Sequence, residues 1–384
     1  MSIRTVFVAT GLSTGGAEMM LLKVLERLDR SRFEPHVISL RDKSEIGPRI
    51  EALGIPVEAL GMRSPALSPW KFLRLVFRLR KLKPAIVHTW MYHADLLGGL
   101  GARMAGVRAI GWRVNHSNLD PQLNKRTTLW VVRICARLST WLPRRILSCS
   151  EKARRVHVAA GYAADKMVVV PNGFDLGRFL PDAAARESVR AELVLEPRTP
   201  LVGIVARFHS QKNIEGFIVA AAAVARVRSD VRFLMVGSGL DAQNETLQAV
   251  IRDSGAADRF HLLGRRDDVP RLMASLDVLA LSSHGEAFPN VVGEGMACGV
   301  PCVATDAGDA AEIIGETGRV VPVGNMAELA RELLAILGLP ESERHQLGRK
   351  ARERVRQMYD IERVVEQYQA FYLSLMTEAG SCAE

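Results

Sequence analysis

Two glutamates, Glu286 and Glu294, stand eight residues apart in the second half of the sequence. The apolar run at 276–281 precedes them and predicts a buried parallel strand. The small residues around Glu294 predict a helix that packs closely on a sheet and ends at Gly299 and Pro301. The carboxyl ends of parallel strands form the ligand-binding edge of an open α/β sheet. Two carboxylates at this edge could hold a ribose and a second sugar through their hydroxyls.

The segment between the two glutamates is expected to form a turn and the start of that helix. Free backbone N–H groups at a helix N-terminus suit a phosphate, so this segment is expected to face the charge between the two sugars. The donor-binding residues expected here are Phe288, Pro289, Asn290 and Val291. The alternative for either glutamate alone is a solvated charge, which is what most glutamates are.

Two cations, Arg207 and Lys212, follow an apolar strand predicted at 200–206. A bidentate guanidinium and a compact ammonium at the end of a strand suit a diphosphate. Gly237 begins a turn after the strand predicted at 232–236, at the same edge of the sheet. Two loop cations alone are more often solvated, but the glutamate pair downstream favours a site for a diphosphate-bearing ligand.

Strand and helix patterns alternate along the 384 residues, and the alternation restarts near residue 200. We therefore predict an α/β fold of two doubly wound Rossmann-like domains that face each other across a cleft. In the first half, a glycine loop with Gly15 and Gly16 follows the opening strand, and His116 lies beyond the end of a later strand. The glycine loop lacks the G-x-G-x-x-G spacing of dinucleotide-binding proteins, so a plain tight turn stays open as its explanation.

Four motifs together resemble those of the family 4 retaining glycosyltransferases, which have two Rossmann-like domains (GT-B type). They are G-G-A-E at 15–18, V-P-N-G-x-D at 170–175, A-R-F-x-x-x-K-N at 206–213 and E-x7-E at 286–294. Ala206 stands where the family usually has glycine. The resemblance covers nearly the whole chain and implies catalytic groups at Arg207, Lys212, Glu286 and His116.

The resemblance also implies individual roles. Arg207 and Lys212 would bind the donor diphosphate, while Glu286 and His116 would contact the transferred sugar. Glu294 would bind the nucleotide ribose. Gly15 and Gly16 would lie across the cleft from the diphosphate, and Gly237 would lie beside the nucleobase.

By the same resemblance, the chain divides into an acceptor-binding domain at 1–178, a nucleotide-sugar-binding domain at 179–358 and a final helix at 359–384. That helix is expected to pack back on the first domain. It is expected to do so with three tyrosines, Tyr359, Tyr368 and Tyr372.

The implied reaction moves a sugar, with retention of its anomeric configuration, from a nucleotide-diphosphate sugar to an acceptor hydroxyl. We expect a UDP-sugar as donor and a glycan or lipid-linked acceptor from cell-envelope polysaccharide or glycolipid synthesis. The sequence has no D-x-D pair, so no metal and no cofactor are expected, and fixed cations with a helix N-terminus take the place of a metal. A sugar-nucleotide epimerase on the same fold is the main alternative. A glycosidase, which needs no diphosphate clamp, is a weaker one.

Charge is unequally distributed, because residues 1–180 carry 29 Lys and Arg against 13 Asp and Glu. Two basic runs at 70–83 and 125–145 contain aromatic residues, including Trp130 and Trp141, and such residues favour a membrane–water boundary. The charge excess suggests an anionic partner, which could be a membrane surface, a phosphorylated lipid or nucleic acid. The two basic runs favour the anionic membrane surface, so no nucleic-acid partner is expected, although ordinary packed helices remain the alternative.

No apolar run is long enough for a membrane span, so a cytoplasmic protein is expected, with attachment to the inner face of the membrane as an extension of that prediction. The cysteines are scattered and lack metal-ligand spacing, which predicts neither a disulfide framework nor a zinc site. They are Cys135, Cys149, Cys298, Cys302 and Cys382.

Overall fold

The computed structural model describes residues 2–62, 69–119 and 124–380. The chain forms two compact units: Met1–Gly173 with Ile361–Glu384, and the continuous segment Phe174–Asp360. The units divide at Gly173 and Asp360, whereas the boundaries predicted from the sequence lie at residues 178 and 358. Phe174 belongs to the second unit because its N–H donates to the Tyr359 carbonyl at 2.8 Å and its ring stacks near Phe288.

The first unit contains a parallel sheet covered by helices on both faces. Its strands are β1 (Ile3–Ala9), β2 (Phe33–Ser39), β3 (Val57–Ala59), β4 (Ile86–Trp90), β5 (Ala109–Val114), β6 (Arg145–Ser148) and β7 (Met167–Val169). Its helices are α1 (Gly16–Arg27), α2 (Ile46–Glu51), α3 (Pro69–Leu82), α4 (Tyr92–Met104), α5 (Arg126–Leu138), α6 (Glu151–Ala159), the short η2 (Ala164–Lys166) and α15 (Ile361–Gly380).

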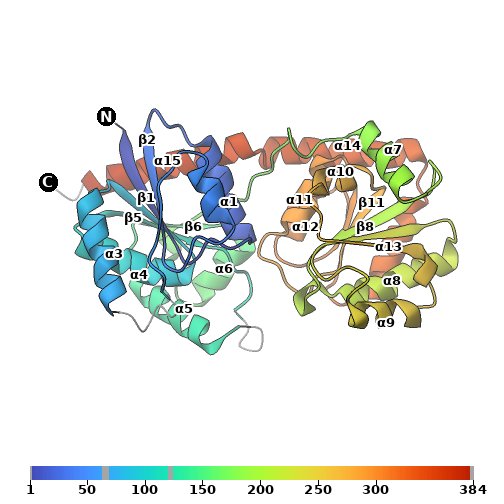
Figure 1. Cartoon of the computed structure of the whole chain (residues 1–384), viewed down its shortest axis with the longest axis horizontal. Helices are drawn as coiled ribbons and strands as arrows, with labels where there is room; N and C mark the ends of the chain where they lie inside the picture. Colours follow the sequence, from blue (N-terminus) through green and yellow to red (C-terminus); the bar gives the residue numbers. More distant parts are fainter. Residues whose placement is uncertain (1, 63–68, 120–123, 381–384) are drawn as a thin grey trace. The chain divides into compact units, whose positions relative to one another are not determined.

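Within the described residues, the strands of this sheet run in the order β3-β2-β1-β4-β5-β6-β7, and every pair is parallel. Helices α3, α4 and α5 pack on one face, and α1, α2 and α15 pack on the other (Figure 1). The chain reverses its direction of winding between β1 and β4, so these two neighbouring strands flank the switch point at which open α/β sheets bind ligands.

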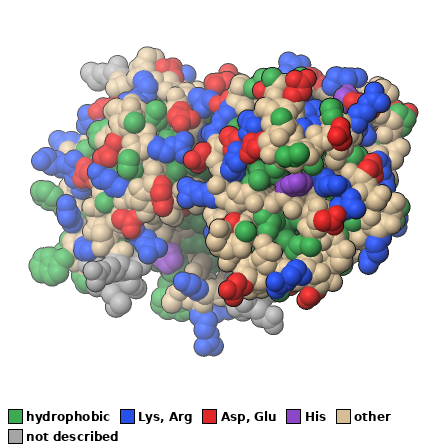
Figure 2. Space-filling model, turned by 45° about the vertical axis from the view of Figure 1, so that its right-hand side comes forward, with side chains coloured by type: hydrophobic (Ala, Val, Ile, Leu, Met, Phe, Trp, Pro, Cys, Tyr) green, Lys and Arg blue, Asp and Glu red, His purple; other side chains and the backbone are tan. Residues whose placement is uncertain are grey.

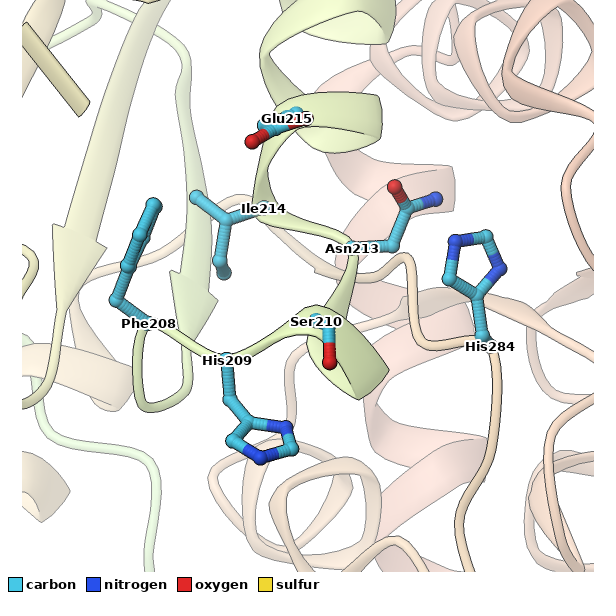
Figure 3. A pocket seen from close by; sticks show the side chains of 7 residues that line it. All are labelled: Phe208, His209, Ser210, Asn213, Ile214, Glu215 and His284. Carbon is cyan, nitrogen blue, oxygen red and sulfur yellow. The ribbon is translucent and has the colours of Figure 1, made fainter. Parts of the chain in front are cut away.

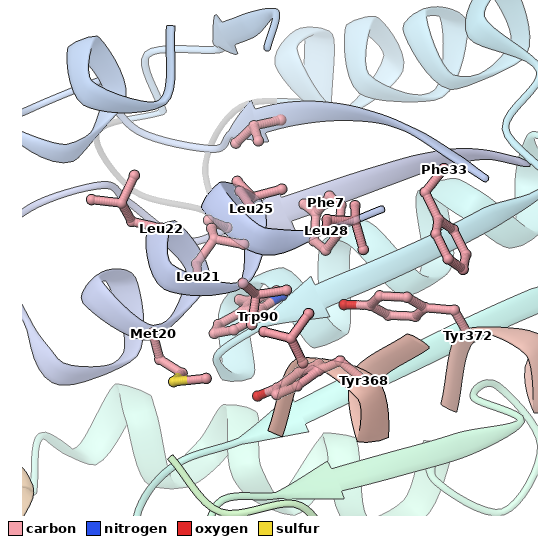
Figure 4. Packing of buried hydrophobic residues seen from close by; sticks show 14 of the residues in the cluster. Phe7, Met20, Leu21, Leu22, Leu25, Leu28, Phe33, Trp90, Tyr368 and Tyr372 are labelled. Carbon is pink, nitrogen blue, oxygen red and sulfur yellow. The ribbon is translucent and has the colours of Figure 1, made fainter. Parts of the chain in front are cut away.

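Helix α15 returns from the end of the chain and completes the core of the first unit. Tyr372 meets the Phe7 ring edge-on at 5.9 Å, and Tyr368 stacks on Trp90 with ring centroids 6.2 Å apart (Figure 4). Tyr359 behaves differently from the expectation, because it precedes the helix and packs its ring against Phe288 of the second unit at 5.9 Å.

The second unit contains another parallel sheet. Its strands are β8 (Leu201–Val205), β9 (Arg232–Val236), β10 (Phe260–Gly264), β11 (Val278–Leu281), β12 (Cys302–Thr305) and β13 (Arg319–Val321). Its helices are α7 (Ala183–Glu192), η3 (Ser210–Lys212), α8 (Ile214–Val227), α9 (Glu245–Asp253), η4 (Ala257–Arg259), α10 (Val269–Ala274), α11 (Asn290–Ala297), α12 (Ala310–Ile314), α13 (Met326–Leu337) and α14 (Glu341–Met358).

The described strands of the second sheet run in the order β10-β9-β8-β11-β12-β13, all parallel. Strands β8 and β11 are buried almost throughout, which is why they read as continuous apolar runs. They flank the switch point of this sheet. The two sheets confirm the predicted α/β fold with two doubly wound Rossmann-like domains.

A buried carboxylate lies at the amino ends of the central strands of the second sheet, opposite the edge that binds ligands in open α/β sheets. The Asp277 side chain, 2% exposed, precedes β11 and accepts from the backbone N–H of Leu201 at the start of β8. Arg190 and Arg186 of α7 pair with it at 2.9 and 2.8 Å, and Arg344 of α14 lies at 3.5 Å. One carboxylate therefore ties two helices to the central strands.

The cysteines Cys135, Cys149, Cys298 and Cys302 are buried and are not part of a disulfide, and Cys382 lies outside the described residues. Within the ranges that the structure describes, no helix is both long and apolar enough to cross a membrane.

Candidate functional site

The loops that follow β8 and β11 bring two of the predicted site residues into contact. Lys212, at the end of η3, forms an ion pair with Glu286, and the Ser283 hydroxyl donates to the same carboxylate oxygen at 2.7 Å. The side chains of Lys212 and Glu286 are 23% and 12% exposed, so the ion pair is partly shielded from water. Contact across 74 residues of sequence follows from the pairing of β8 with β11.

Hydrogen bonds join the two loops directly. The Ser282 hydroxyl lies 2.9 Å from the Lys212 carbonyl and 3.0 Å from the Asn213 carbonyl, and the His284 N–H donates to the Gln211 carbonyl at 2.8 Å. Asn213 has a left-handed backbone, with φ of 48°, and its side chain caps the N-terminus of α8. The loops are therefore held at a fixed spacing, and the ion pair is preorganised.

Arg207 lies on the same loop, beside Gly237. The N–H of Phe208 donates to the Ser238 carbonyl at 2.8 Å, which ties the loop after β8 to the turn after β9. Gly237 has φ of +141°, and a Cβ there would lie 1.8 Å from the Ala206 carbonyl oxygen. Only glycine permits this close approach. The Arg207 side chain is exposed.

Glu294 lies on α11, which begins at Asn290. Two glycines beside it permit tight packing, because a Cβ at Gly293 would lie 2.1 Å from the Phe174 ring and one at Gly295 would lie 2.5 Å from Leu279. The Phe288 ring is buried against Phe174, so this residue can offer a ligand only its backbone. The same holds for Pro289, which is buried just before the helix.

A cavity of about 400 Å³ opens beside the loop that carries Lys212 (Figure 3). It is lined by Phe208, His209, Ser210, Asn213, Ile214, Glu215 and His284. These residues come from the same two segments that carry Lys212 and Glu286. Among the described parts of the chain, no group of three or more His, Cys, Asp or Glu side chains could hold a metal ion.

In the first unit, the glycine loop and His116 lie at the carboxyl edge of the sheet. Gly15 precedes α1, and a Cβ on it would lie 2.4 Å from the carboxylate of Glu18. Burial raises the pKa of Glu18. His116 lies two residues beyond β5, and burial lowers its pKa. Gly16 is the first residue of α1.

His116 contacts an aromatic residue that was not among the predicted site residues. The ring of Tyr92, the first residue of α4, stacks on His116 with centroids 5.6 Å apart and an angle of 27° between the planes. His88, in contrast, is a core residue whose Nδ1 lies 3.1 Å from the Tyr372 hydroxyl. Its complete burial lowers its pKa well below the usual value.

Two family models match successive parts of the chain. Residues 14–178 match the model described as Glycosyltransferase Family 4, and residues 199–338 match the model described as Glycosyl transferases group 1. The N-acetyl-alpha-D-glucosaminyl L-malate synthase of Bacillus anthracis is 31% identical over 176 residues, which are 45% of this chain and 45% of that protein.

A second relative is similar over a longer segment. The UDP-Gal:alpha-D-GlcNAc-diphosphoundecaprenol alpha-1,3-galactosyltransferase of Escherichia coli is 26% identical over 303 residues, 76% of each protein. The solved structure of Anabaena Alr3699/HepE in complex with UDP has the same fold, with a TM-score of 0.85 at 23% identity over 97% of this chain and 100% of the other. The chain has two parallel sheets, and the loops after β8 and β11 bring Lys212 and Glu286 into contact. Together with the two family matches, these features establish that the chain belongs to the family 4 glycosyltransferases, enzymes with the GT-B fold.

Proposed function

We propose that the protein transfers a sugar from a UDP-sugar to an acceptor hydroxyl with retention of configuration. The observation that carries this proposal is the contact between Lys212 and Glu286. In a sugar nucleotide the anomeric carbon is bonded directly to the diphosphate. A group that grips the sugar and a cation that neutralises the phosphate must therefore lie side by side, as these two side chains do.

In the proposed reaction, Arg207 and Lys212 stabilise the charge that develops on the departing diphosphate. The bond between the anomeric carbon and the phosphate oxygen breaks, and the acceptor oxygen bonds to the same face of that carbon. The acceptor proton passes to the leaving phosphate oxygen. His116 and Glu286 orient the sugar, and Glu294 binds the ribose.

We further propose a lipid-linked acceptor. The Escherichia coli relative is named for a UDP-galactose donor and a diphosphoundecaprenol-linked acceptor, and the Anabaena protein of the same fold was solved with UDP. A lipid-linked acceptor also suits the basic first unit, because residues 1–180 carry an excess of Lys and Arg.

The experiment that tests the reaction incubates the protein with UDP-sugars and polyprenyl-diphosphate-linked sugars. A larger glycolipid should form with one UDP released per transfer, and NMR of early product should show the donor's anomeric configuration. An interconverted UDP-sugar without UDP release would identify an epimerase, and an inverted product would contradict the front-face reaction.

Replacing Glu294 with alanine should weaken UDP binding by roughly tenfold or more, because hydrogen bonds to a charged group contribute about 1.5 to 3 kcal/mol. Glu286→Ala should leave UDP affinity near that of the unchanged protein and weaken the discrimination among donor sugars. Calorimetry with UDP and with several UDP-sugars measures both effects. Glu316→Ala, at an exposed position of the same unit, is the control. Unchanged UDP affinity in the Glu294 variant would refute the ribose role.

We also propose that α3, α4 and α5 form a membrane-docking face. Helix α4 packs against both neighbours. Trp70 and Phe77 of α3 are 82% and 70% exposed, and Trp130 of α5 is 65% exposed. Residues 69–145 contain fifteen Lys and Arg but two acidic residues, Asp95, which is fully buried, and Asp120, which lies outside the described residues. Arg78 pairs with Glu58 and Arg145 pairs with Glu378, and the remaining excess of cations beside exposed aromatic rings suits an anionic lipid interface.

Vesicle co-sedimentation tests this face. Binding should rise with the fraction of anionic lipid and fall with salt. Arg74→Gln combined with Lys81→Gln should weaken it by roughly 30-fold, at about 1 kcal/mol for each charge. The control changes both Val219 and Val227 to serine, because these are exposed apolar positions of α8, outside the proposed docking face. This variant should bind the vesicles like the unchanged protein. If the unchanged protein does not co-sediment with anionic vesicles at low salt, the proposed docking face is refuted. That result would not contradict the proposed transfer reaction.

A further inference from the structure

The Tyr92 ring that stacks on His116 is held by a third residue, His157 of α6. The Tyr92 hydroxyl lies 2.8 Å from Nε2 of His157, and Nδ1 of His157 lies 2.7 Å from the Ala153 carbonyl. Tyr92 is 3% exposed, and His157 is fully buried. The three side chains therefore form a chain of contacts that runs from α6 through the start of α4 to the end of β5.

The hydrogen-bond partners fix the proton positions in this chain of contacts. A carbonyl oxygen only accepts, so Nδ1 of His157 must carry the proton. Burial, with a smaller effect of His116, lowers the pKa of His157 to about 4, although the bond to Ala153 opposes this. The ring is therefore neutral at pH 7, and its Nε2 accepts from the Tyr92 hydroxyl.

The backbone at Tyr92 is also unusually constrained. Met91, which precedes it, has φ of 77° and ψ of 153°, a region that essentially only glycine occupies. This conformation is held by the Met91 N–H, which donates to the Arg113 carbonyl of β5 at 3.2 Å, and the Tyr92 carbonyl accepts from the Cys135 thiol at 3.6 Å. Such strain persists where the surroundings enforce it, and it often marks a functional site.

We propose that Tyr92 and His157 are positioning residues for His116. Tyr92 fixes the plane of the His116 ring by stacking, and His157 fixes Tyr92 through its hydroxyl. The stack covers one face of the His116 ring, and the two ring nitrogens are the atoms that can form a hydrogen bond with a hydroxyl of the transferred sugar. The inference rests on the proposed function, because it assumes that His116 contacts that sugar.

Tyr92→Phe removes the hydroxyl and keeps the ring, and Tyr92→Leu removes both. The turnover number should fall by several-fold in the first variant and by about tenfold or more in the second, because small misplacements of a positioned group are costly. The affinity for UDP should stay within about twofold, since Arg207, Lys212 and Glu294, which are proposed to bind UDP, belong to the second unit. His157→Gln, whose side-chain carbonyl can accept from Tyr92, should retain more turnover than His157→Leu.

Tyr162→Phe is the matched control. The Tyr162 ring also contacts His157, with centroids 5.0 Å apart and an angle of 88° between the planes, so the substitution removes a different buried hydroxyl beside the same imidazole. It should leave turnover within about twofold of the unchanged enzyme. If it lowers turnover as much as Tyr92→Phe, general packing around His157 explains the effect and the proposal fails.

A second readout does not depend on activity. NMR of labelled histidine should show the His116 side-chain signal broadened or shifted in Tyr92→Phe and unchanged in Tyr162→Phe. If the Tyr92 variants lose thermal stability but keep both the turnover number and the His116 signal, the role of Tyr92 is structural only and the proposal is overturned. If the unchanged protein transfers no sugar, the proposed function fails, and the His116 signal still tests the positioning of the ring.

Discussion

Replacing Lys212 with alanine should lower the turnover number by about 100- to 1000-fold, equivalent to about 3 to 4 kcal/mol of transition-state stabilisation. The ammonium lies against Glu286 in a partly buried site, where a preorganised charge acts more strongly than it does in water. Binding of UDP should weaken much less, because the charge that the lysine stabilises grows only as the bond to the sugar breaks. Single-turnover kinetics with saturating UDP-sugar measure the loss.

Lys350→Ala provides the control, since this lysine is exposed on α14 of the same unit. A Lys212→Ala enzyme with nearly normal turnover would show that the contact with Glu286 is an ordinary surface ion pair. The diphosphate would then have to be stabilised by Arg207 and the N-terminus of α11 alone.

The second large effect concerns stability. Asp277→Ala should destabilise the second unit by about 3 to 5 kcal/mol, because removal of one partner leaves buried charge without compensation. The Arg190 side chain is 4% exposed and that of Arg344 is 12% exposed, so neither can recover its hydration without movement of its helix. The melting temperature should fall by roughly 10 °C for a unit of this size.

Asp253→Asn, at an exposed position of α9, should leave the melting temperature nearly unchanged. Replacing Asp277, Arg190, Arg186 and Arg344 together by apolar residues should cost less than removing Asp277 alone, since no charge is then stranded. If the Asp277→Ala variant has the same melting temperature as the unchanged protein, water must hydrate the three arginines. The charge cluster would then not be buried.

The fold was predictable where burial is complete. Strands β8 and β11 are apolar along their length, and β9 was predicted with the bounds that the structure gives. Helix α6 was not predicted, because only Ala153 and His157 among its nine residues are buried and its apolar pattern is correspondingly weak.

The candidate site was predictable as residue types but not as contacts. Lys212 and Glu286 were selected separately, whereas their ion pair depends on β8 and β11 being neighbours, a strand order that the sequence does not state. Tyr92 and His157 were missed for the same reason. The nearest signal was the position of Tyr92 at the junction of a strand and a helix, but the unusual backbone of Met91 cannot be read from a methionine.

Helix α15 has a consequence for the order of events during protein synthesis. The second unit is one continuous segment, and it can fold as soon as residue 360 has left the ribosome. The first unit is translated earlier, yet the apolar surface around Phe7 and Trp90 lacks its cover until Tyr368 and Tyr372 emerge. The part of the chain made first therefore completes its core last. A released chain that ends at Asp360 should expose that apolar surface to chaperones while its second unit is already native.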